Sequence, residues 1–166
     1  MSILTQSTIT NKLSFSGIGV HTGKEVNLNI IPSAPNTGII FKRIDLSHNN
    51  IVIPNFENVS DATLCTTISN DHGVKVSTVE HLMAAFLGLG IDNAIVELDS
   101  QEVPILDGSA IDYVNILKEN GLKQSDVPIK LIKINNYVEI VDGSKFISVD
   151  KSNTTLEIEF EIDYEN

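Results

Sequence analysis

A segment with helical periodicity, residues 77–93 (STVEHLMAAFLGLGIDN), constrains the fold of this chain more than any other stretch. Apolar side chains recur there at intervals of three and four residues, at Val79, Leu82, Met83, Phe86 and Leu87. This spacing predicts a helix with one face packed on a core. A second face carries His81 with small neighbours, Ala84, Ala85 and Gly88, which would let another element approach closely. Gly88 and Gly90 are expected to end the helix in a left-handed cap.

Short strand-like runs surround this helix. Val26, Leu28 and Ile30 alternate with polar residues, which predicts a half-buried strand at residues 25–31. Further strands are expected at residues 5–16, 39–43, 51–53, 56–59, 63–69, 74–76 and 94–98. A second helix is predicted at about residues 109–120, with Ile111, Val114 and Leu117 facing inward. The pattern indicates an α+β fold, a two-layer sheet-plus-helices domain spanning residues 1–122.

The pattern changes after residues 121–128 (GLKQSDVP), which we interpret as a linker. Strands are expected beyond it at residues 130–134, 137–141, 145–150 and 154–162, with a hairpin turn at Asp142-Gly143. No helix follows to cover their apolar faces, and a small sheet with a bare face is a poor end point for folding. Residues 128–166 are therefore expected to form an incomplete second domain of β-strands only.

Composition excludes several classes of protein. A net charge of −11 disfavours binding to nucleic acid or to anionic membrane surfaces. The longest nearly apolar run, residues 82–91, is too short for a transmembrane segment. The single cysteine, Cys65, rules out an intrachain disulfide, and we see no signal peptide, so a cytoplasmic location is expected.

Glu80 and His81 are the first candidates for chemistry. Adjacent side chains on a helix diverge by about 100°, so the two cannot both bind one metal ion as an i, i+4 pair does. They can flank a common point, with His81 as a metal ligand and Glu80 as general base toward a water molecule. The alternative is structural, because Ser77 and Glu80 have the spacing of a capping box. Both interpretations stay open from these residues alone.

Other candidates are weaker. His21 lies in a glycine-rich turn, GIGVHTGK (17–24), whose spacing does not match a phosphate-binding loop. The turn is either only a tight connection or a loop that brings His21 or Lys24 to an anionic ligand. Cys65 is expected to be a small buried residue within a strand, and Asp107 or Ser109 to cap the second helix. His48 and His72 lie in polar turns and are expected to be solvated.

Four blocks taken together carry a resemblance: GIGVHTGK (17–24), TLCTTI (63–68), STVEHLMAAFLGLGIDN (77–93) and EVPILDGSA (102–110). They resemble the zinc-dependent UDP-3-O-acyl-N-acetylglucosamine deacetylases of lipid A biosynthesis in Gram-negative bacteria. The resemblance implies two similar α+β domains whose helices are sandwiched between the two sheets, so residues 128–166 would open the second domain. It also implies a hydrolase whose zinc is held by two His and one Asp.

The resemblance assigns roles to individual residues. His81 matches the first zinc-binding His, and Glu80 matches the general base that activates water against the N-acetyl group. Leu64 and Cys65 match positions near the site, and His21 matches a His close to it. The remaining zinc ligands are expected beyond residue 166.

Two functions follow. The whole protein is expected to deacetylate UDP-3-O-acyl-N-acetylglucosamine, and the 166-residue chain to be inactive alone. The alternative is a non-catalytic module that binds a nucleotide-sugar or a partner through its exposed helix layer. Because bare apolar helix faces favour association, we expect the chain to pair with the missing C-terminal domain or to self-associate.

Overall fold

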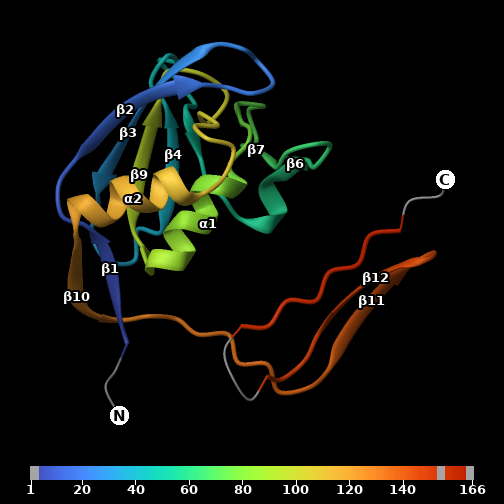
Figure 1. The fold of residues 1–166 in the computed structure, drawn as a ribbon. Coiled ribbons are helices and arrows are strands. Elements are labelled where there is room, and N and C mark those ends of the chain that lie inside the picture. Colours follow the sequence, from blue (N-terminus) through green and yellow to red (C-terminus); the bar gives the residue numbers. More distant parts are fainter. Residues whose placement is uncertain (1–3, 153–155, 164–166) are drawn as a thin grey trace. The chain divides into compact units, whose positions relative to one another are not determined.

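The computed structural model describes residues 4–152 and 156–163, and these fall into two compact units, Met1–Ile129 and Lys130–Asn166. The first unit contains a five-stranded sheet in the order β2-β3-β9-β4-β5. Its strands are β2 (Leu13–Ile18), β3 (Glu25–Pro32), β9 (Ala94–Leu98), β4 (Ile39–Arg43) and β5 (Ile51–Val52). Helices α1 (Glu80–Leu89) and α2 (Ile111–Asn120) lie side by side over one face of this sheet (Figure 1). The α+β, two-layer fold expected for this part is confirmed.

The core lies between the sheet and the two helices. In β3 the residues Val26, Leu28 and Ile30 are buried, as their alternation predicts. Ile30 is paired with Val96 of the antiparallel neighbour β9, while β4 runs parallel to β9. Alternate residues of a strand point to opposite faces, so one face of the sheet carries the apolar side chains that the helices cover.

The inward faces of the helices differ slightly from the predicted ones. Leu82 and Phe86 of α1 are buried, but Leu87 is 77% exposed and Ala85 is buried in its place. In α2, Leu117 is buried as predicted, Ile111 is exposed, and Tyr113 fills the core. Because consecutive helical residues are about 100° apart, a buried Phe86 turns Leu87 toward solvent. Gly90 ends α1 with φ of 69°, which is the predicted left-handed cap.

The segment interpreted as a linker is a strand, so that prediction is wrong. Residues Leu122–Pro128 form β10, which pairs antiparallel with β1 (Thr5–Ile9). The Gln6 amide also donates a hydrogen bond to the Pro128 carbonyl at 3.0 Å. The polar residues that suggested a linker are accommodated because, among the described residues, β10 pairs with β1 alone.

A small three-stranded sheet precedes α1. It consists of β6 (Val59–Asp61), β7 (Thr67–Ser69) and β8 (Lys75–Val76), preceded by the 3-10 helix η1 (Phe56–Asn58). The hairpin between β7 and β8 is formed as predicted. The strand expected over residues 63–69 begins only at Thr67. No helix in the described part of the chain combines the length and hydropathy needed to cross a membrane.

The described residues of the second unit form one hairpin. Strands β11 (Val138–Asp142) and β12 (Lys145–Val149) pair with Asp142 opposite Lys145, so the predicted turn is confirmed. The strand expected at residues 130–134 is not formed. Of the strand expected at residues 154–162, residues 156–162 do not form a strand, and residues 154 and 155 lie outside the described residues. A strand needs a neighbour to satisfy its backbone groups, and neither segment pairs with another strand in the described residues. The predicted domain boundaries, with the first domain ending at residue 122 and the second beginning at residue 128, stay a prediction.

The two neighbouring positions on α1 give a matched test of the core. Phe86→Ala should lower the free energy of unfolding of the first unit by about 3–5 kcal/mol, because it leaves a cavity under the sheet. Leu87→Ala should change it by no more than about 0.5 kcal/mol. Denaturant titrations followed by far-ultraviolet circular dichroism measure both. A larger loss from Leu87→Ala would contradict the burial of the two residues.

Candidate functional site

Glu80 is the first residue of α1, and a backbone amide outside the helix holds its carboxylate. The Thr66 N–H donates to Glu80 Oε2 at 3.0 Å. The capping box is not formed: the N-cap residue, Val79, makes no side-chain cap bond. Ser77 instead donates its N–H to the Gln101 carbonyl at 2.8 Å. The structural interpretation of the Ser77–Glu80 spacing is therefore wrong, because segments outside α1 bind both residues.

The segment just before β7 brings two further predicted residues to Glu80. Leu64 is 89% exposed and has a positive φ of 63°. Cys65 is half-buried, with its sulfur 3.7 Å from the Thr67 hydroxyl oxygen. It is not in the middle of a strand, contrary to the sequence prediction, because β7 starts two residues later. Cys65 directly precedes Thr66, whose N–H binds Glu80, and Leu64 precedes Cys65, so the segment that contains both reaches the Glu80 carboxylate through Thr66.

His81 lies half-exposed at the second position of α1. Hydrogen bonds from the Ser109 N–H and hydroxyl hold the pKa of Asp107 below its usual range, and the charge of His81 contributes to the same shift. Asp107, in the loop before α2, is thus within electrostatic range of His81. The Ser109 hydroxyl also accepts a bond from the Ile111 N–H at 3.1 Å. Ser109 thus satisfies a donor of α2, although the N-cap position itself is Ala110.

His21 lies exposed in the turn between β2 and β3. The turn is closed by two backbone bonds, from Gly19 N–H to the Lys24 carbonyl at 2.9 Å and from Gly23 N–H to the Gly19 carbonyl at 2.8 Å. The backbone of this turn also binds a carboxylate that the sequence analysis did not identify. The N–H groups of His21 and Thr22 donate to the two oxygens of Glu102, at 2.9 and 2.8 Å.

Glu102 is fully buried, with 0% exposure. Its Oε1 also accepts a bond from the Thr78 hydroxyl at 3.0 Å. Burial alone would raise the pKa of Glu102, but bonds from His21, Thr22 and Thr78 outweigh it and hold the pKa below its usual range. The sequence carried one signal: an acid directly before the apolar run VPIL is poorly placed for an ordinary solvated loop.

The residues of this chain do not by themselves fit a complete zinc site. Zinc in a catalytic site commonly takes three protein ligands and leaves one position open. Nowhere in residues 4–152 and 156–163 do three His, Cys, Asp or Glu side chains gather closely enough to hold a metal ion. His81 is partly exposed, so its ring is accessible as a single ligand.

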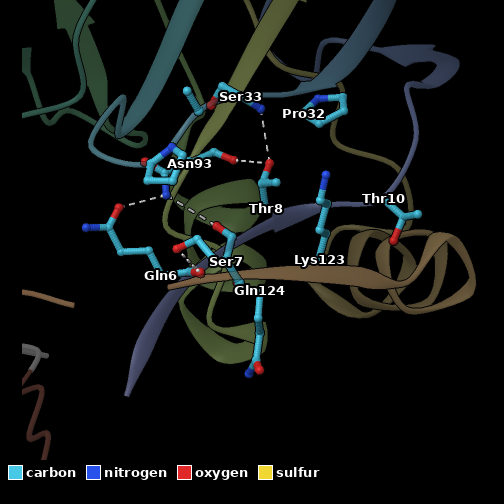
Figure 2. Close-up of a pocket in the computed structure, with 12 residues that line it drawn as sticks. Gln6, Ser7, Thr8, Thr10, Pro32, Ser33, Asn93, Lys123 and Gln124 are labelled. Atoms are coloured by element: carbon cyan, nitrogen blue, oxygen red, sulfur yellow. Dashed lines mark hydrogen bonds between the residues drawn. The ribbon is translucent and has the colours of Figure 1, made fainter. Parts of the chain in front are cut away.

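A cavity of about 340 Å³ lies away from these residues, between β1, β10 and the loop after β3 (Figure 2). Its polar groups mainly bind one another. The Thr8 hydroxyl donates to the Asn93 carbonyl at 2.6 Å and accepts from the Ser33 N–H at 3.1 Å. The Asn93 amide donates to Gln6 Oε1 at 3.0 Å. None of the five predicted site residues lines this cavity, and its bonds serve to join β1 to the start of β9.

Residues 6–166 match the sequence-family model described as LpxC: UDP-3-O-acyl N-acetylglycosamine deacetylase. The chain belongs to this family. A UDP-3-O-acyl-N-acetylglucosamine deacetylase of Shewanella sp. (strain W3-18-1) is 41% identical over 159 residues, which are 96% of this chain and 52% of the relative. The protein of the same name from Shewanella oneidensis is 40% identical over the same shares. The chain thus spans about half the length of the curated relatives it matches.

The four motif blocks of the LpxC resemblance meet at one end of α1. Glu102, of the fourth block, binds the His21 turn of the first block and Thr78 of the third. Thr66 of the second block binds Glu80 of the third. Residues far apart in the sequence are therefore joined by hydrogen bonds around the Glu80–His81 pair. The roles of Glu80, His81, His21, Leu64 and Cys65 in this LpxC chain stay predictions.

The Thr66–Glu80 bond can be tested by hydrogen exchange. Glu80→Ala should speed exchange of the Thr66 amide roughly tenfold or more, because a bond to a charged acceptor contributes about 1.5–3 kcal/mol. Glu80→Gln should retain much of the protection, since its amide oxygen still accepts. Glu57→Ala, at an exposed acid of η1, is the matched control and should leave that amide unchanged. An unprotected Thr66 amide in the unmodified chain would contradict the bond.

Proposed function

We propose that this chain contributes the Glu80–His81 part of a zinc-dependent deacetylase site that acts on UDP-3-O-acyl-N-acetylglucosamine. Family membership supports the reaction class. The observation that carries the proposal is the Thr66–Glu80 bond, because it directs the Glu80 carboxylate away from helix capping. It brings that carboxylate to the segment that contains Leu64 and Cys65, which we propose to lie beside the substrate, with His21 nearby.

Glu80 acts as general base in this proposal. Its Oε2 is held by the Thr66 N–H at 3.0 Å, which fixes the direction of the carboxylate. Its other oxygen, Oε1, takes the proton from the water that attacks the N-acetyl carbonyl, and the products are the free amine and acetate. A positioned general base of this kind contributes about 10²–10⁴-fold to the rate.

His81 supplies one nitrogen ligand. Zinc, when bound, would activate water and polarise the carbonyl group. The other ligands would come from segments outside these 166 residues, in keeping with the half-length match to the relatives. By itself the chain would bind zinc weakly and show no deacetylation. We also propose a cytoplasmic location, on the basis of the sequence.

A non-catalytic module is the second candidate. The observation that favours it is the lack of a three-ligand cluster within residues 4–152 and 156–163. In that case the exposed face of α1, with Ala84, Leu87 and Gly88, would bind a partner, or the chain would bind a nucleotide-sugar.

A fusion of this chain to the part of a relative that it does not match distinguishes the two candidate functions. The chain would be joined to the part of the Shewanella sp. (strain W3-18-1) deacetylase beyond its matched region, and zinc content and deacetylation of UDP-3-O-acyl-N-acetylglucosamine would be measured. The fusion should be active. Glu80→Gln should lower kcat by about 10²–10⁴-fold with zinc retained, whereas His81→Ala should lose the zinc.

His72→Ala is the matched control, because His72 lies exposed in the β7–β8 turn. It should leave both zinc content and kcat unchanged. A folded fusion that binds zinc but is unaffected by Glu80→Gln would contradict the proposed base. Full activity of the unfused 166-residue chain with stoichiometric zinc would contradict the proposal that other segments complete the site.

Exposed apolar side chains also predict association of the isolated chain. Leu87 on α1 is exposed, and so are Leu156, Ile158 and Phe160 in the second unit. Light scattering should show an average mass that rises with concentration, because exposed apolar side chains favour self-association. Leu87→Lys should weaken this rise, and His72→Lys, which adds the same charge at an exposed turn, should not. A strictly monomeric chain at high concentration would refute the expectation.

A further inference from the structure

We propose that Glu102 is a positioning residue whose buried carboxylate joins the His21 turn to the residue that leads into α1, and so places Glu80 and His81. The proposal rests on the proposed function only where it concerns catalysis. Its structural part concerns this chain alone.

The carboxylate binds two segments through three donors. The His21 N–H and the Thr78 hydroxyl both donate to Oε1, at 2.9 and 3.0 Å, and the Thr22 N–H donates to Oε2 at 2.8 Å. Backbone pairing continues on the Thr78 side, where the Val103 N–H donates to the Ser77 carbonyl at 3.0 Å. Glu102 is therefore the link between the His21 turn and the approach to the helix.

The His21 turn is shaped to admit this carboxylate. A Cβ atom at Gly19 would lie 2.4 Å from Glu102 Oε2 and 2.5 Å from the Thr22 hydroxyl oxygen. Contacts that short do not occur between a real Cβ and an oxygen, so only glycine lets the backbone of the turn approach Glu102 this closely. The glycine in this motif thus serves the approach to a buried acid, and not a phosphate.

The other segment is strained where Glu102 binds it. Thr78 has a positive φ of 59°, a region that β-branched residues rarely adopt. Such conformations persist only when surrounding interactions hold them, and they cluster at functional sites. The bond from the Thr78 hydroxyl to Glu102 is one such interaction, and Glu80 follows only two residues later. A change at Glu102 should therefore propagate to the first turn of α1.

Glu102 cannot itself act on a substrate, because its side chain is buried. Neither of the ion pairs found in the described residues includes it, so neutral donors alone balance its charge. A buried carboxylate is costly where an apolar side chain would fill the space. Its directional bonds to two segments are what an apolar residue could not provide, which favours positioning over simple packing.

The first experiment uses the 166-residue chain and needs no activity. In amide spectra recorded against pH, the His21 and Thr22 resonances should titrate together with a midpoint below 4.5, the usual value for a Glu carboxyl. Glu102→Gln should abolish this titration and speed exchange of both amides about tenfold or more, because the new NH₂ group faces N–H donors. It should also shift the Thr66 amide and the His81 ring resonances. Glu25→Gln, at an exposed acid beginning β3, is the control and should change none of these.

The second experiment uses the active fusion. Glu102→Gln should lower kcat at least about tenfold with little change in KM and leave zinc content intact. Glu102→Asp, which keeps the charge on a shorter side chain, should partly restore kcat. If Glu102→Gln does not fold, the Glu102→Asp variant and the pH titration of the unmodified chain decide in its place.

The outcomes are distinct. If Glu102→Gln lowers stability but leaves the Thr66 and His81 resonances and kcat unchanged, the positioning role is overturned and a purely structural role remains. No titration of the His21 and Thr22 amides in the unmodified chain would do the same. An inactive fusion with Glu102 intact would count against the proposed function, while the spectra of the chain alone would still decide the role of Glu102.

Discussion

The arrangement around α1 depends on one buried carboxylate and the donors that satisfy it. A charged group can stay ionised out of contact with water only if hydrogen bonds replace its hydration. Glu102 obtains them from the His21 turn and from Thr78, and this demand brings the two segments together. Gly19 is the steric counterpart of the same constraint, since any side chain there would collide with the acid.

Glu80 shows how a local preference yields to tertiary contacts. Its spacing from Ser77 suits a capping box, which would stabilise the start of a helix. In the structure α1 begins without a side-chain cap, and Glu80 binds the Thr66 N–H from the segment before β7. The helix forgoes a capping bond, and its start is held by burial of Leu82 and Phe86 against the sheet. The Glu80 carboxylate is thereby directed to the segment before β7 and away from the backbone of its own helix.

The two units differ in how well they bury apolar surface. In the first, two helices cover one face of a five-stranded sheet and a continuous core results. In the second, the described residues contain one hairpin, and Val138, Ile140, Phe146 and Ile147 are exposed. A two-stranded hairpin is marginal alone. The first unit is therefore well packed, whereas the described part of the second unit leaves apolar side chains exposed.

Local patterning by itself determined much of the first unit and the hairpin turn of the second. Period-two alternation placed β3, glycine and helical spacing placed α1 and its left-handed end, and Asp142-Gly143 placed the hairpin turn. The motif blocks pointed to Glu80 and His81. Tertiary structure decided what depends on partners distant in sequence. Residues 122–128 pair with β1, and Tyr113 is buried while Ile111 is exposed. Thr66 binds Glu80, and Glu102 joins the His21 turn to Thr78. Periodicity shows which face of a helix or strand is apolar. Which hydrogen-bond donor meets which acceptor depends on segments distant in sequence, and these come together only when the chain folds.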